Sequence, residues 1–430
     1  MREPVARRWA LGALGALAVL AVVMGALSLG RGASAAWMIS DAKQYYAWTR
    51  SVIVDGDLDF ANDYELLYPP DPLPPEWHQR TPAGRTPNKY PFGVALLQAP
   101  AVWLAHVLAR GGAGPADGEA PPYQWAAGLS LVAWALLGGY GFFAGAGRWK
   151  VTPGWALWGL LGMLGATPLA HYLTKEPGMA HGPGWATLGL LLWLSAPTEN
   201  GGRWAGGRYL AIGALSGLLV LLRNTNVVLL PWVAGLLWAR GGARPVRGWG
   251  WLALGFVGVV LWQPLVFHRL WGGWQWRTHS GEGFTGGAQG LWGTLFAVRH
   301  GALFFHPWYG LLLLLNALGL THKTTRRPCA LAWLAFGGLW LAHGLWWCWW
   351  LGRSFGNRAF IEALTPLTFG AALVLSVRPI SRRSARLIWG LTALAILASA
   401  YLWLGYLARA YCDDGLHTAR ELWAWPLHGL

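Results

Sequence analysis

Carboxylate side chains gather in one short part of the sequence. Eight of the 18 Asp and Glu residues lie between residues 32 and 91: Asp41, Asp55, Asp57, Asp59, Asp63, Glu65, Asp71 and Glu76. A positioned carboxylate can act as a general base that removes the proton from an attacking hydroxyl group. Asp41, in the stretch SDAKQYY, is our candidate base. The alternative is structural, because Ser40 can cap a helix that runs to about Val54 and Asp41 would stabilise its first turn.

The acidic turn DGDLDFANDYE, residues 55–65, resembles a calcium-binding loop at first glance. An EF-hand loop requires Gly after its third acid and Glu six positions later, where this sequence has Phe60 and Leu66. We therefore expect a solvated acidic turn. Four possible metal ligands follow residue 270: His279, Glu282, His300 and His306. Their spacing matches no zinc-binding motif. A divalent metal is supported by no motif, and we expect that no cofactor is required.

A second candidate acid, Glu176, stands in the stretch YLTKEPGMAH beside Lys175 and five residues before His181. An acid at the end of an otherwise acid-free apolar stretch is a candidate catalytic residue. The structural alternative is a Lys175–Glu176 pair at the surface. We select Glu176 as a second catalytic candidate and Lys175 and His181 as candidates for binding a substrate.

Four basic side chains are candidates for holding a phosphate, because guanidinium and ammonium groups suit that anion. They are Lys89, Arg223, Arg353 and Arg358. The alternatives are an anchor at the membrane surface for Lys89, exposed anchors for the two arginines of WWLGRSFGNR, and an ion pair of Arg358 with Glu362 one helical turn away. Neighbours of these groups are further candidates for substrate binding, namely Tyr45, Tyr90 and Asn357.

The elements that must position these residues are predicted to be transmembrane helices. The 430 residues are 55% hydrophobic and 12% charged, about half the charged fraction of a typical soluble protein. Apolar stretches of about 20 residues, the length that spans a bilayer, recur along the chain. We therefore predict an all-α polytopic membrane protein that begins with a retained first span. The net charge of +15 does not indicate nucleic acid, because the basic residues lie in short loops between apolar runs.

The distribution of Lys and Arg predicts the topology. We expect about 11 spans, at roughly 9–29, 123–147, 154–173, 184–197, 208–222, 226–240, 248–270, 307–321, 330–350, 359–377 and 386–408. The N-terminus and all the basic loops can be cytoplasmic only if the apolar run 92–109 does not cross the membrane. We therefore expect this run to lie in the membrane interface. The chain is then one integral membrane domain, residues 1–430. Residues 31–122 form the first extracytoplasmic loop, 409–430 form a short C-terminal tail, and every candidate site residue lies outside.

These features resemble the GT-C glycosyltransferases, membrane enzymes that use polyprenyl-phosphate sugars. The resemblance is to the branch that holds protein O-mannosyltransferases, the lipid A aminoarabinose transferase and the lipopolysaccharide-core sugar transferases. Members of that family carry a catalytic acid soon after the first span, a position that Asp41 would fill. Juxtamembrane helices follow in the family, which the segments 40–54 and 92–109 would match. A second acid before Pro often ends a later span, as Glu176 does. Two departures are the lack of an acidic pair at 40–42 and of a large soluble domain after the last span.

The resemblance implies an inverting glycosyltransferase that moves a sugar from a polyprenyl-phosphate donor to a lipid, glycan or protein acceptor. The strings HGALFFHPWYGLLLLL and GRSFGNRAFIEALTP resemble bacterial members, which implies the inner membrane of a bacterium. Two other classes stay open, a flippase or transporter of lipid-linked sugars and a non-catalytic scaffold. Charged groups at the middle of spans would favour the transporter, whereas here they cluster at span ends.

Overall fold

The structure, a computed structural model, describes residues 1–30, 36–68, 79–198, 204–239, 246–279, 281–411 and 417–424. Within these ranges every regular element is a helix. The predicted all-α class of membrane protein is confirmed.

Five helical stretches in the described residues are long and apolar enough to cross a membrane. They are α1 (Glu3–Leu29), α4 (Gly93–Leu108) with its π-helical end η3 (Ala109–Ala113), α5 (Pro121–Arg148), α11 (Val246–Val260) continued by α12 (Trp262–Trp271), and α18 (Arg382–Leu407). Each has exposed leucine side chains, as lipid-facing helices do.

Shorter helices pack between and alongside these five. They are α6 (Pro153–Gly165), α7 (Leu169–Thr174), α8 (His181–Leu194), α9 (Gly206–Leu222), η4 (Asn224–Leu229), α10 (Leu230–Ala239), α15 (Trp308–Gly319), α16 (Arg326–Gly344), η5 (Arg358–Phe360) and α17 (Leu364–Val377). Small residues let these helices approach closely. A Cβ added to Gly189 of α8 would lie 2.1 Å from the carbonyl oxygen of Gly138 in α5, so only glycine fits there.

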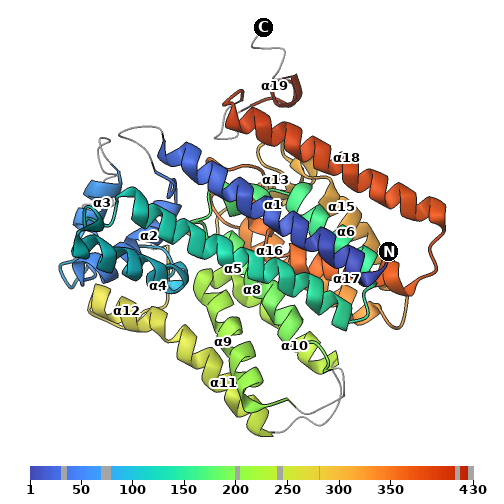
Figure 1. The fold of residues 1–430 in the computed structure, drawn as a ribbon, viewed down its shortest axis with the longest axis horizontal. Coiled ribbons are helices and arrows are strands. Elements are labelled where there is room, and N and C mark those ends of the chain that lie inside the picture. Colours follow the sequence, from blue (N-terminus) through green and yellow to red (C-terminus); the bar gives the residue numbers. More distant parts are fainter. Residues whose placement is uncertain are drawn as a thin grey trace.

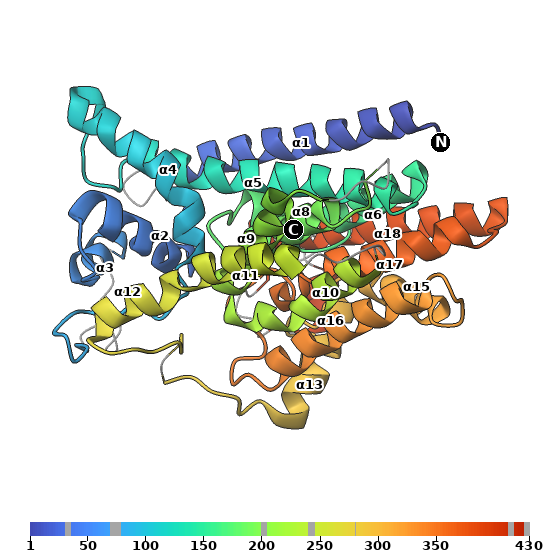
Figure 2. The same ribbon diagram turned by 90° about the horizontal axis from the view of Figure 1, so that it is seen from below.

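The bundle has two ends of different character (Figures 1 and 2). The N-terminus lies at one end, together with the turns that join α5 to α6, α15 to α16 and α17 to α18. Four of the basic clusters used for the topology prediction belong to these segments: Arg2, Arg7 and Arg8; Arg148 and Lys150; Lys323, Arg326 and Arg327; and Arg378, Arg382, Arg383 and Arg386. Their gathering at one end is what a common cytoplasmic side requires.

The opposite end carries α2 (Ala42–Arg50), its π-helical continuation η1 (Ser51–Asp55), α3 (Ala61–Leu67) and α4. The predicted helix from residue 40 to about Val54 is present, but Ser40 does not cap it. Ser40 has a positive φ of 54° and no capping hydrogen bond is made by the side chain at the helix start. The backbone carbonyls of Ile39, Ser40 and Asp41 accept the first amide hydrogen bonds instead.

Helix α4 contains Pro100, runs steeply across this end of the bundle (Figure 2) and packs against α2. By length and composition alone it could cross a membrane. Its position agrees with an interfacial helix, and the absence of a crossing at 92–109 stays a prediction. Three short helices complete the fold: α13 (Gly287–Phe296), α14 (Ala302–Phe305) and α19 (Ala419–Ala424).

Candidate active site

A cavity of about 680 Å³ opens at the end of the bundle that carries α2. Its walls come from widely separated segments: the start of α2, residues 89–91 before α4, the junctions α7–α8 and α9–η4, the loop 277–284 and residues 342–358. Seven of the residues selected from the sequence line it: Asp41, Tyr45, Lys89, Tyr90, His181, Arg223 and Arg358. The fold therefore brings together polar side chains that are up to 317 positions apart.

Asp41 and Arg358 form an ion pair in the wall of this cavity. Arg358 donates from Nη2 to Asp41 Oδ2 at 2.6 Å. About 32% of the Asp41 side chain stays exposed, against 9% for Arg358. Burial alone would raise the pKa of Asp41, but the charge of Arg358, a hydrogen bond from Tyr90 and the charge of Lys89 together hold it below its usual value. Asp41 is thus a carboxylate that stays ionised while facing the cavity.

Lys89 is paired with Glu282, whose position in the sequence suggested no partner. Its Nζ lies 2.6 Å from Glu282 Oε1, while Trp347 Nε1 donates to Glu282 Oε2 at 3.0 Å. Arg277 donates to the backbone carbonyl of Glu282 at 2.7 Å. The hydrogen bonds from Lys89 and Trp347 outweigh burial, so the pKa of Glu282 is lowered. These contacts hold the loop 277–284 over the cavity.

Tyr45 and Tyr90 pack edge to face at 4.7 Å beside Asp41, and His279 lies 4.9 Å from the Tyr90 ring. Burial raises the pKa of both tyrosines well above their usual value, so both stay neutral hydrogen-bonding groups. Burial also lowers the pKa of His279 to about 4, which makes it neutral at physiological pH.

Arg223 is the centre of a buried cluster on the other side of the cavity. Its Nη1 lies 3.3 Å from Glu362 Oε1 and 3.0 Å from His181 Nδ1, and its Nη2 lies 3.3 Å from His343 Nε2. A guanidinium can only donate, so His343 Nε2 accepts and that ring is neutral. His181 Nδ1 also lies 3.3 Å from Glu362 Oε2, and burial together with the charge of Arg223 holds the pKa of His181 well below its usual value. Glu362 alone balances the charge of Arg223, and the suggested Arg358–Glu362 pair is not formed.

Four of the selected residues lie outside the cavity walls. Glu176 is buried with Oε1 3.4 Å from His171 Nε2, and Lys175 Nζ contacts Ser28 Oγ at 3.0 Å. Asn357 accepts a hydrogen bond from Ala359 N and donates to Thr294 O, so it caps η5, which begins at Arg358. Arg353 is exposed.

The turn that follows Glu176 supports the start of α2. A Cβ added to Gly178 would lie 2.6 Å from both Ala42 Cβ and Met38 Sδ, so the glycine lets this turn pack directly beneath Asp41. The acid–proline string that attracted attention in the sequence therefore has a structural role next to the site.

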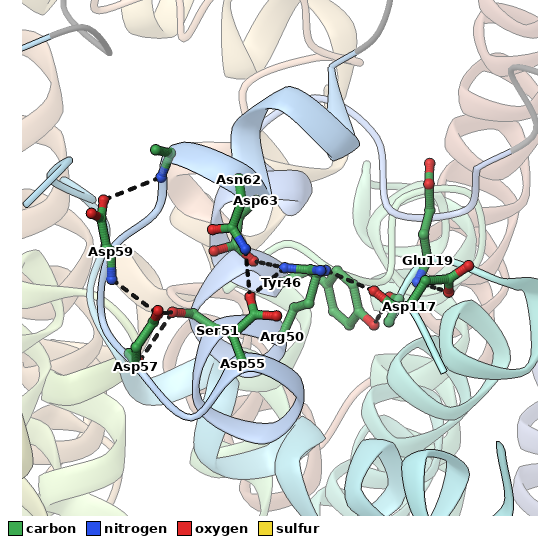
Figure 3. A network of polar contacts seen from close by, with 12 residues as sticks. Tyr46, Arg50, Ser51, Asp55, Asp57, Asp59, Asn62, Asp63, Asp117 and Glu119 are labelled. Atoms are coloured by element: carbon green, nitrogen blue, oxygen red, sulfur yellow. Dashed lines mark hydrogen bonds and ion pairs between the residues drawn. The ribbon is translucent and has the colours of Figure 1, made fainter. Parts of the chain in front are cut away.

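A second ionic network fixes the other end of α2 (Figure 3). Arg50 Nη1 lies 2.5 Å from Asp55 Oδ2 and 2.9 Å from Asp63 Oδ1, and Arg50 Nε donates to the carbonyl of Asp117 at 2.9 Å. Tyr46 donates to the next carbonyl, that of Gly118, at 2.5 Å. The acids 55–63, expected as a solvated turn, thus partly surround one arginine that ties α2 to α3 and to the loop before α5.

The backbone around the cavity is strained. Six residues other than glycine have a positive φ in the described ranges, and three of them are at the site: Ser40 next to Asp41, and the cavity-lining His279 and Leu351. Such conformations persist only where surrounding contacts enforce them, and they are concentrated at functional sites.

Some lining residues were not found from the sequence. Arg277 lies in a long polar loop that gave no motif, and His343 is a single histidine inside an apolar helix, a signal that the rarity of ionisable groups in spans could have raised. Among the described residues no three His, Cys, Asp or Glu side chains are grouped so that they could hold a metal ion. The metal requirement stays a prediction.

No protein-family model matches the sequence, and neither does any curated protein. Among solved structures, ArnT from Cupriavidus metallidurans, in complex with undecaprenyl phosphate, superposes with a TM-score of 0.52 over 94% of this chain and 66% of ArnT. The chain has a GT-C-like fold. At 16% identity the likeness to ArnT concerns the fold, and the chain spans just under two thirds of the length of ArnT. Membership of the GT-C superfamily and of one of its branches stays a prediction.

Proposed function

We propose that the chain is an inverting glycosyltransferase that moves a sugar from a polyprenyl-phosphate donor to an acceptor at the extracytoplasmic face of a bacterial inner membrane. The observation that carries the proposal is the meeting of Asp41, an ionised and partly exposed carboxylate, with four cationic side chains in one cavity: Lys89, Arg223, Arg277 and Arg358. A carboxylate beside a phosphate-binding group is the combination that glycosyl transfer from a lipid phosphate requires.

The reaction follows from this arrangement. Asp41 removes the proton from an acceptor hydroxyl, whose oxygen attacks the anomeric carbon of the sugar. The bond between that carbon and the phosphate oxygen breaks, and the leaving lipid phosphate gains one negative charge, which Lys89, Arg223 and Arg277 are placed to stabilise. A single displacement inverts the anomeric centre. Arg358 keeps Asp41 ionised and oriented before the acceptor arrives.

The likeness to ArnT supports the nature of the donor, since ArnT was solved with undecaprenyl phosphate bound. We extend to this chain the use of such a lipid phosphate. The acceptor is a lipid, glycan or protein hydroxyl. The segments that line the cavity lie at the end of the bundle opposite the basic loops, which supports an extracytoplasmic site.

Lipid-linked sugar profiling by mass spectrometry tests this function without knowledge of the acceptor. A strain that lacks the gene should accumulate one polyprenyl-phosphate sugar, and the wild-type gene should restore its level. Asp41→Asn keeps the size of the side chain but removes the base, which typically lowers a rate by about 10²–10⁴-fold, so it should fail to restore the level. Asp57→Asn, in the exposed turn, is the matched control and should restore it.

Two outcomes would change the proposal. Equal pools of lipid-linked sugars with and without the gene would rule out a transferase. Full restoration by Asp41→Asn together with none by Glu176→Gln would assign the base to Glu176 and leave Asp41 as a residue that begins a helix.

A further inference from the structure

Each carboxylate at the cavity is already paired with a cation. The pairs are Asp41 with Arg358 at 2.6 Å, Glu282 with Lys89 at 2.6 Å, and, just behind the wall, Glu362 with Arg223 at 3.3 Å. In all three the distance is that of a hydrogen-bonded ion pair, so each carboxylate of the described walls already has a cationic partner, with which a cation of the substrate would have to compete.

One cation of the described cavity walls is in excess. The exposed Arg277 donates to a backbone carbonyl, not to a carboxylate. Of the four cations of the described walls, Lys89, Arg223 and Arg358 each have a carboxylate partner, so Arg277 adds one positive charge without such a partner. The charge of Glu176, which lies outside the walls, acts on Arg358. The histidines add no charge, because burial lowers the pKa of His279 to about 4 and the pKa of His181 well below its usual value, and His343 accepts a hydrogen bond from Arg223.

A sugar linked to a lipid through a phosphodiester brings one negative charge, which balances the surplus. The rest of the described wall is uncharged and includes five aromatic side chains: Tyr45, Tyr90, Phe284, Trp346 and Trp347. Phe284 and Trp346 lie 5.2 Å apart, edge to face, and Phe284 is 64% exposed. Such rings offer apolar faces to the C–H surfaces of a neutral sugar, and the tyrosines and tryptophans add polar groups for its hydroxyls. An ammonium group could gain a cation–π contact there, but it would meet no carboxylate that lacks a cationic partner and would face a cationic wall.

From this charge balance we infer that the cavity selects a donor whose sugar carries no positive charge, a neutral or N-acylated sugar in preference to an amino sugar. The inference rests on the proposed function, because it places the donor's phosphate in the same cavity. It adds the class of sugar, which the GT-C-like fold alone does not specify.

The test compares three donors that differ only at one position of the sugar. Purified full-length protein would be assayed for displacement of labelled undecaprenyl phosphate by undecaprenyl-phosphate glucose, glucosamine and N-acetylglucosamine. At about pH 6, where a sugar amine is protonated, we expect glucosamine to compete at least about tenfold less well than the other two, a difference of about 1.4 kcal/mol. At about pH 9 the amine is neutral, and the difference should shrink below about threefold.

Two variants separate the surplus charge from other causes. Arg277→Gln removes it and should reduce the discrimination at about pH 6 to below about threefold. Arg80→Gln makes the same charge change at an exposed pair with Asp59, away from the cavity walls, and should leave the discrimination intact.

The outcomes distinguish this inference from the proposed function. If the glucosamine donor competes as well as the glucose donor at about pH 6, or if no sugar donor competes although undecaprenyl phosphate binds, the inference is overturned and the lipid-phosphate site stands. If undecaprenyl phosphate itself does not bind, the proposed function fails and the inference fails with it.

Discussion

Arg358 holds the carboxylate of Asp41 at 2.6 Å, although the two residues are 317 positions apart in the chain. The pair joins the start of α2 to the segment that precedes α17, and it lies in the wall of the cavity. Its chemical effect is on protonation. Burial opposes the charged form of Asp41, and Arg358 is the strongest of the groups that favour it.

Removal of this cation should shift the pH dependence of turnover. In the wild type the pKa of Asp41 is lowered, so the base stays ionised and active down to acidic pH. In Arg358→Gln the effect of burial is no longer balanced, the pKa of Asp41 rises, and the acid limb of the pH–rate profile should move to higher pH. Arg358→Lys should restore the profile only partly, because a point charge replaces a planar fork.

The control for this experiment is Arg353→Lys, since Arg353 is exposed and lies outside the cavity walls. We expect it to bind undecaprenyl phosphate as the wild type does. Weaker binding by this variant would show that Arg353 contributes to phosphate binding, as its position in the sequence suggested. An unchanged acid limb in Arg358→Gln would show that Asp41 is not the titrating base.

The buried Arg223–Glu362 pair should control the stability of the bundle. Glu362 is fully buried, and Glu362→Gln leaves Arg223 without a counter-charge. Loss of one partner of a buried pair typically costs about 3–5 kcal/mol. In thermal unfolding of the purified protein, the double variant Arg223→Gln with Glu362→Gln should be less destabilised than the sum of the two single variants. Additive effects would mean that the pair contributes no coupling.

Asp63 should make the stability of the outer loop depend on pH. Two carboxylates share the guanidinium of Arg50, and burial of Asp63 outweighs that hydrogen bond and raises its pKa to about 7. An unfolded Asp titrates near about 3.9. Between these values the folded chain holds a proton that the unfolded chain has released, so the free energy of unfolding falls as pH rises towards 7. Asp63→Asn cannot titrate and should lose this dependence.

Melting temperatures measured from about pH 5 to pH 8 test the role of Asp63. The variant should gain stability relative to the wild type as pH rises from about 5 towards 7 and should gain no more above it, whereas Asp59→Asn, at an exposed pair with Arg80, should follow the wild type. Parallel pH curves for Asp63→Asn and the wild type would contradict a raised pKa of Asp63.

Cysteine labelling tests the topology. Ala116, between α4 and α5, and Thr324, between α15 and α16, are both exposed. If 92–109 does not cross, Ala116→Cys should react with a membrane-impermeant reagent in intact cells, and Thr324→Cys only after permeabilisation. The wild-type chain controls for the native cysteines. Labelling of Ala116→Cys only after permeabilisation would make α4 a span and reverse the side of every later loop.

The all-α membrane class could be predicted, because apolar length is a local property of the sequence. The side of the membrane on which Asp41 and Lys89 lie stays a prediction from loop charge. Partners could not. Helical spacing suggested Glu362 for Arg358, but η5 and the turn after it interrupt the helix before α17 begins at Leu364, so the two side chains diverge. Asp41 and Arg358 are joined by tertiary packing, which no local pattern records. The place of Glu176 was equally hidden: the turn that follows it packs against the start of α2, and its catalytic role stays a prediction.

The spread of the cavity walls along the chain also has a consequence for synthesis of the protein. At about 5–20 residues per second, Asp41 leaves the ribosome roughly 15–60 s before Arg358 does. During that interval the first outer loop lacks its distant cation, and it depends on the local contacts of Arg50 to keep α2 folded. A chain interrupted before η5 would lack Arg358, the partner of Asp41. Under the proposed function, the chain should gain the ability to transfer a sugar only after Arg358 has been synthesised.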